Sequence, residues 1–298
     1  MSLFVVFLWS TSLVIVKVEG NGVAPLYYAG LRYVLASIPL VAISIVKNRG
    51  VALHKYSLGR YLALGATGYF FAQGLLYIGI YSLSTAAVAI ILNLMPVFAI
   101  ALSIPTTREY PSGTETAAVG LALVGVMLFF SKDGMGAVNI KGIAAMACAS
   151  ASWALHSLLI RKISLERDHR SVIDNTAYPM LFGSLMMLGA SAVSGDVTAF
   201  DPSIAPSLVW LAFVNTSLAF VLWNMAHAHL RAYEVSMAHN TMVFQASLLA
   251  WAALGDSLDR FEAMGVLTVF AALALLEYGR KLQARFDSTP ERILKHVK

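Results

Sequence analysis

Ten apolar runs follow one another along this 298-residue chain, and they restrict its fold more than any other feature. Most approach the length of about 20 residues that a helix needs to cross the hydrocarbon core of a bilayer. Hydrophobic residues make up 58% of the sequence and charged residues 12%, roughly half the charged share of a soluble domain. Since a helix satisfies its own backbone hydrogen bonds in lipid, we predict an all-α membrane protein with ten transmembrane helices. The expected spans are 3–18, 24–46, 58–80, 86–105, 115–131, 141–160, 172–194, 206–226, 233–254 and 261–279.

The middle of the chain repeats the way the chain begins. LWSTSLVIVK at residues 8–17 is similar to ASWALHSLLIRK at 151–162, and in each copy a tryptophan, Trp9 or Trp153, precedes a cation by eight residues. Five spans per copy is an odd number, so the second copy must insert upside down relative to the first. We therefore predict two inverted five-helix repeats, the arrangement from which many secondary transporters are built. The expected domains are 1–134, 135–280 and a basic cytoplasmic tail, 281–298.

Basic residues indicate how the chain crosses the membrane. With the N-terminus in the cytoplasm, sixteen of the 21 lysines and arginines fall on cytoplasmic segments and four on external ones. This asymmetry agrees with the positive-inside rule and predicts a multi-pass protein of the plasma or inner membrane with both termini cytoplasmic. The cations lie between apolar runs, so we expect a lipid bilayer as partner and no nucleic acid. No basic lead-in or cleavage site accompanies the first run, which is interpreted as a retained span.

Several motifs together resemble those of one family. Besides the two tryptophan openings, the chain has GLRY at residues 30–33, with Arg32 inside a span, and Pro96 followed thirteen residues later by Glu109. These features are similar to the ten-helix drug/metabolite transporters of the EamA type. The second half departs from the family pattern, because Asp256 replaces the usual glutamate and the matching proline is absent near Val243. The resemblance implies helices around a central cavity and transport by alternating access.

Polar and aromatic side chains within the apolar runs are candidates for the cavity lining. Tyr69, Gln73, Tyr77 and Tyr81 recur every four residues, which places them on one face of a helix. An amide in lipid is costly, so this face should contact protein or water. Polar residues also join helices directly, a structural role that stays open for the glutamine and asparagines. The predicted substrate-binding residues are Trp9, Arg32, Gln73, Tyr77, Asn93, Trp153, His156, Trp223, Asn224 and His239.

Arg32 is the most informative charge, since it lies about eight residues into its span. A guanidinium there must find a structural partner, extend to the interface or meet an anionic substrate. Lys17, at the end of the first span, is either an interfacial anchor or a second cation for the same anion. Together they favour an amino acid or another organic anion as substrate.

Absences exclude other kinds of site. No Asp or Glu lies in the middle of an expected span, so proton coupling would need His156 or His239; otherwise the carrier is a facilitator or exchanger. His227 and His229 point to different helix faces, and Cys148 is the only cysteine, so neither a metal site nor a cofactor is expected. Catalytic motifs are missing, which argues against an enzyme.

The predicted function is therefore a monomeric secondary transporter that exports a small organic metabolite, such as an amino acid. Two alternatives remain. One is a carrier or exchanger of phosphorylated or nucleotide sugars, which would need more inward-facing cations than this chain offers. The other is a membrane scaffold that transports nothing.

Overall fold

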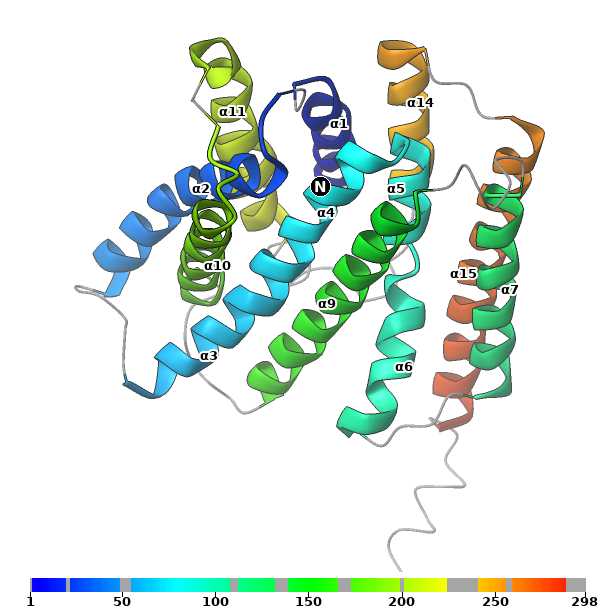
Figure 1. Ribbon diagram of the computed structural model, residues 1–298. Helices are drawn as coiled ribbons and strands as arrows, with labels where there is room; N and C mark the ends of the chain where they lie inside the picture. Colours follow the sequence, from blue (N-terminus) through cyan, green and yellow to red (C-terminus); the bar gives the residue numbers. More distant parts are fainter. Residues whose placement is uncertain are drawn as a thin grey trace, which may run out of the picture. The chain divides into compact units, whose positions relative to one another are not determined.

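Helices account for all regular structure in the part of the chain described by the computed structural model (Figure 1). The described residues are 2–19, 22–48, 55–107, 112–131, 139–165, 173–198, 201–223, 241–255 and 259–287. Six helical stretches in them are long and apolar enough to cross a membrane: Pro25–Asn48, Leu58–Ser82, Ile140–Ile160, Asp174–Val193, Pro202–Trp223 and Arg260–Gly279. Each of the ten predicted runs contains helix, so the all-α class is confirmed.

The chain divides into two compact units, and the larger contains residues 1–102 and 139–257. It thus combines segments from both predicted repeats. Its elements are α1 (Ser2–Glu19), α2 (Pro25–Asn48), α3 (Lys55–Gly65), η1 (Ala66–Phe71), α4 (Ala72–Ser82), α5 (Thr85–Leu92), the start of α6 (Met95–Thr107), α9 (Ile140–Leu165), α10 (Asp174–Val193), η2 (Pro202–Ile204), α11 (Ala205–Ala212), η3 (Phe213–Leu218) and α14 (Met242–Leu254).

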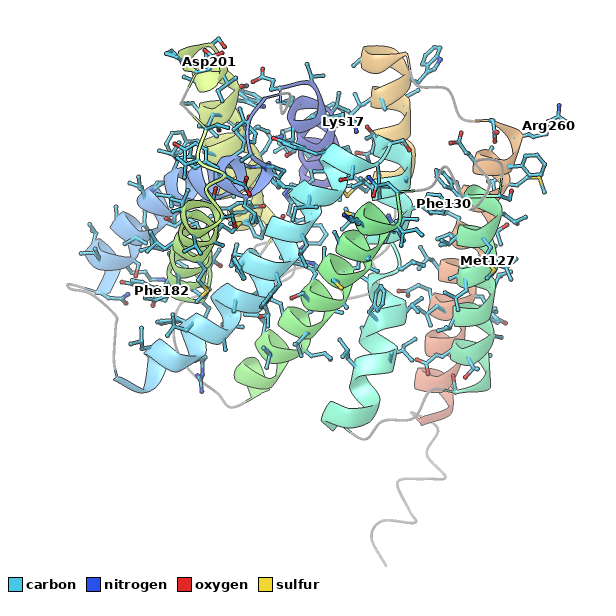
Figure 2. All side chains as sticks on the ribbon, in the orientation of Figure 1. Lys17, Met127, Phe130, Phe182, Asp201 and Arg260 are labelled. Carbon is cyan, nitrogen blue, oxygen red and sulfur yellow. The ribbon has the colours of Figure 1, made fainter. Side chains whose placement is uncertain are left out.

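The smaller unit is built on two helices that pack along each other, the last predicted span of each repeat. They are α7 (Gly113–Phe129) and α15 (Arg260–Asp287). A Cβ atom on Gly265 would lie 2.6 Å from the carbonyl oxygen of Gly125, so the two backbones meet where neither has a side chain. Met127, labelled in Figure 2, is 73% exposed. Apolar exposure of this kind suits a helix surrounded by lipid.

The buried carboxylate of Asp174 belongs to the close contact between α2 and α10. Ser44 Oγ donates a hydrogen bond to Asp174 Oδ1 at 2.5 Å, and Asn48 Nδ2 donates to the same oxygen at 3.0 Å. Asp174 is the first residue of α10. The carboxylate therefore lies at the end of a span, as the sequence indicates, and not at its middle.

The fourth predicted span, 86–105, is divided rather than continuous. α5 ends at Leu92, a turn follows, and α6 begins at Met95. The amide of Leu94 donates to the Ile91 carbonyl at 3.0 Å, one residue closer than in an α-helix. Pro96 has no N–H and cannot bond the carbonyl four residues before it, which explains the break.

Candidate functional site

A cavity in the larger unit has about 80 Å³ of space in which water-sized molecules can be centred. Side chains from α1, α2, α4, α5, α9 and α14 line it, together with Met95 of α6 and Phe220 of the 202–223 stretch. A single water needs about 10–15 Å³ on this measure, so there is room for several waters or a small organic group. Most lining residues are aromatic or aliphatic and a few are polar, which is typical of sites for organic ligands.

Five of the ten residues predicted from the sequence line this cavity. They are Trp9, Arg32, Gln73, Tyr77 and Trp153. The tryptophans that begin the two predicted repeats are both present, each beside Phe220, with ring centroids 5.6 Å from it for Trp9 and 6.2 Å for Trp153. The helices α1 and α9 thus contribute the same aromatic group to one cavity.

Arg32 is 4% exposed, and all the hydrogen bonds recorded for its guanidinium end on uncharged oxygens. Nε donates to Thr216 Oγ1 at 2.8 Å, and Nη1 donates to Ser12 Oγ at 2.6 Å and Tyr77 Oη at 2.8 Å. Nη2 has a long contact, 3.5 Å, to the Asn215 carbonyl. Arg32 is also the only charged residue among the described residues of the lining. A buried cation held by neutral groups attracts an anion that enters beside it.

Three other predicted residues are not part of the cavity wall. The His156 ring stacks on Trp153 at 5.4 Å, and Trp223 packs against Trp9 at 4.9 Å. Asn93 Nδ2 donates to the Ala89 carbonyl of its own helix at 2.9 Å. The ring contacts place His156 and Trp223 behind lining residues, whereas Asn93 is bonded to its own helix and does not line the cavity. The last two predicted residues, Asn224 and His239, lie outside the described part of the chain.

Reasoning from the sequence missed several groups at the site. Ser12, Tyr33 and Ser150 line the cavity, and Thr216 and Asn215 contact Arg32. The repeat contained a signal for Ser12, which follows Trp9 by three residues as His156 follows Trp153. Nothing in the local sequence marked Thr216 or Asn215, since serine, threonine and asparagine are common in packed membrane helices.

Comparison with known proteins decides the family. The model of the EamA-like transporter family matches residues 1–131 and 140–278, nearly the whole chain. The chain belongs to the EamA-like transporter family. It is therefore a membrane transporter of small metabolites and not an enzyme.

Relatives within the EamA-like family are distant in sequence but similar in length. A probable amino-acid metabolite efflux pump of Salmonella typhimurium is 24% identical over 292 residues, 95% of each chain. An S-adenosylmethionine/S-adenosylhomocysteine transporter of Chlamydia trachomatis is 24% identical over 278 residues, 86% of this chain and 83% of the other. One crystal structure matches 92% of this chain and 95% of its own, with a TM-score of 0.67 and 15% identity. That likeness shows a shared fold.

Lys17, labelled in Figure 2, contacts the end of α4 of this EamA-like chain and does not line the cavity that contains Arg32. Its Nζ donates to the carbonyl oxygens of Ile80 at 2.8 Å and Leu83 at 2.6 Å. Carbonyls at a helix C-terminus lack partners within the helix, and a cation there also interacts favourably with the helix dipole. This geometry favours a structural role for Lys17 over the second anion-binding cation considered from the sequence.

The Lys17→Met variant is expected to lose stability without losing affinity for the solute. Removing a charged donor from two carbonyls should lower the free energy of unfolding by about 1–2 kcal/mol. The KM for transported solute should change by less than about twofold, because the cavity keeps its lining. Thermal unfolding in detergent and flux in proteoliposomes measure the two effects. Lys141→Met, which removes an exposed lysine from α9, is the control. A large rise in KM at unchanged stability would place Lys17 in the solute site.

Proposed function

We infer that the chain exports a small organic metabolite, an amino acid or a related compound, with the cavity beside Trp9, Arg32 and Trp153 as the solute site. The observation that carries this proposal is the buried guanidinium on a cavity wall whose other described residues are uncharged and mostly aromatic or aliphatic. A carboxylate accepts hydrogen bonds from a guanidinium, and aromatic rings accommodate the apolar part of the solute. The relatives' named solutes support this class, since amino acids and S-adenosylmethionine both carry an amino group and a carboxylate.

The proposed mechanism is alternating access between two inverted five-helix repeats in the cytoplasmic membrane, with both termini in the cytoplasm. Equivalent tryptophans at one cavity, and the pairing of α7 with α15, support a symmetric relation between the halves. In such carriers a solute site lies between two repeats that move relative to each other. Phosphorylated sugars receive less support, because the described lining offers Arg32 as its single cation.

Flux measurements test the solute class directly. The purified protein in liposomes is expected to exchange at least one radiolabelled compound from a panel of L-amino acids and S-adenosylmethionine. Export is measured separately, as accumulation of that compound in the medium of overproducing cells. Absence of flux for the whole panel would contradict the proposed substrate class.

Substitution of the paired tryptophans tests the location of the site. Trp9→Ala and Trp153→Ala should each raise the KM of the transported compound about tenfold or more, because both partly buried rings line the cavity and tryptophan is among the strongest contributors to binding. Trp251→Ala is the matched control, since Trp251 lies on α14, is 61% exposed and does not line the cavity. If all three variants had the same KM, the solute would bind elsewhere.

A further inference from the structure

Two six-residue π-helical turns interrupt the α-helices of the larger unit, at matching places in the two halves of the chain. One is η1, in the third predicted span, and the other is η3, in the eighth. They begin 147 residues apart, at 66 and 213, which is also the spacing from Glu109 to Asp256 in the repeat. Such turns are rare in proteins, and many of those known lie at functional sites. Their recurrence in both copies points to a shared role.

Each turn contacts the tryptophan-bearing helix of the opposite half. In η3, Asn215 Nδ2 donates to the carbonyl of Leu8, the residue before the first cavity tryptophan, at 2.6 Å. In η1, the Thr67 carbonyl accepts a hydrogen bond at 2.8 Å from the Oγ of Ser152, which is the residue before the second cavity tryptophan. The residue before each cavity tryptophan is therefore hydrogen-bonded to a π-helical turn from the other half of the chain.

The turn η3 also orients Arg32. Thr216 Oγ1 donates its proton to the Leu211 carbonyl at 2.9 Å, five residues earlier, so its lone pairs face the guanidinium Nε–H at 2.8 Å. Ser217 Oγ donates to the Ala36 carbonyl at 2.6 Å, which attaches the turn to α2 one helical turn beyond Arg32. Thr216 and Ser217 thus connect one π-helical turn to the helix that carries the cation.

The contacts of the guanidinium differ between its nitrogens. Nε and Nη1 have acceptors within 2.8 Å, whereas the recorded contact of Nη2 is the one at 3.5 Å to the Asn215 carbonyl. A guanidinium has five N–H donors in a planar fork, so holding Nε determines where the others point. Nη2 is consequently the nitrogen best able to donate to an acceptor that enters the cavity.

We propose that Thr216 and Asn215 are positioning residues of the solute site. Thr216 orients the Arg32 guanidinium toward a carboxylate in the cavity, and Asn215 holds Trp9 beside it. Neither residue lines the cavity, so each acts through another side chain. This inference rests on the proposed function, because it assigns the cavity to an anionic solute, but binding alone can test it without transport.

Benzoate and benzamide are suitable probes, because they have nearly the same shape and only benzoate carries the negative charge. Binding to the purified protein is followed by tryptophan fluorescence, to which Trp9 and Trp153 contribute from the cavity wall. The unsubstituted protein should bind benzoate more tightly than benzamide. Thr216→Val should weaken benzoate binding about tenfold, because a hydrogen bond that orients a charged group is lost, and should leave benzamide binding within about twofold.

Control variants separate positioning from a general loss of structure. Thr216→Ser keeps the hydroxyl and should restore benzoate affinity, while Thr268→Val removes a hydroxyl from the smaller unit, where it bonds only its own helix, and should change neither probe. Thr216→Ala removes the same hydroxyl without adding bulk and replaces the valine variant if that fails to fold. Equal affinities of the unsubstituted protein for the two probes, or equal weakening of both by Thr216→Val, would overturn the proposal. Intact benzoate preference without solute flux would instead contradict the proposed function alone.

Discussion

Replacing Arg32 with glutamine is expected to reduce kcat/KM for a carboxylate solute about a hundredfold, the cost of removing one partner from a buried, hydrogen-bonded charge pair. In the protein without solute, the guanidinium has neutral hydrogen-bond partners and receives no compensating charge from them. The solute carboxylate would supply that charge. Flux in proteoliposomes over a range of solute concentrations measures the effect.

The same variant is expected to stay folded and to unfold at an equal or higher temperature. Burying a cation without a counter-ion is unfavourable, and glutamine can still hydrogen-bond to its neutral neighbours. Loss of transport with retained stability is the signature of a binding residue, whereas a structural arginine would lose both together.

Two further variants make the Arg32 result specific. Arg32→Lys keeps the charge but not the planar fork, so it should recover part of the flux. Arg260→Gln removes an exposed arginine from the smaller unit, labelled in Figure 2, and should have no effect on flux. If Arg32→Gln left the KM of every transported carboxylate unchanged, Arg32 would not belong to the solute site.

Gly183→Ala is expected to lower the free energy of unfolding by about 3 kcal/mol, at the upper end of what overpacking usually costs. A Cβ atom on Gly183 would lie 2.5 Å from the Gly65 carbonyl oxygen and 2.5 Å from Tyr69 Cβ. The first of these is a backbone atom, so α10 would have to move away from α3 and η1. Thermal unfolding monitored by tryptophan fluorescence measures the loss.

Gly189→Ala provides the matched control on the same helix. Apart from its chain neighbours and the backbone of its own helix, no atom lies within 4 Å of the position of its Cβ. Only helix propensity therefore changes, and alanine is favoured over glycine by about 1 kcal/mol. The two variants should therefore shift the unfolding temperature in opposite directions. Equal shifts would mean that α3 and α10 do not meet at Gly65 and Gly183.

Part of the cavity lining could be predicted from the sequence, because two of its signals are local. Trp9 and Trp153 occupy equivalent places in the two similar segments from which the repeat is predicted, and both line the cavity. Gln73 and Tyr77 follow a four-residue period that places them on one helix face, and both line it as well. Asn93 is polar like Gln73, but its side-chain amide donates a hydrogen bond to the Ala89 carbonyl of its own helix, at the break before Pro96.

Apolar run lengths and basic residues determined that this chain is helical, belongs in a membrane and carries a cation within a span. Lipid imposes those properties on each segment separately, so they are visible in the sequence of each segment. Only the tertiary structure decided which oxygens hold Arg32, that Lys17 contacts the end of α4, and that π-helical turns join the halves. Arg32 and Thr216 are 184 positions apart, and whether two such groups meet depends on how their helices pack, which the hydrophobicity of either helix does not specify.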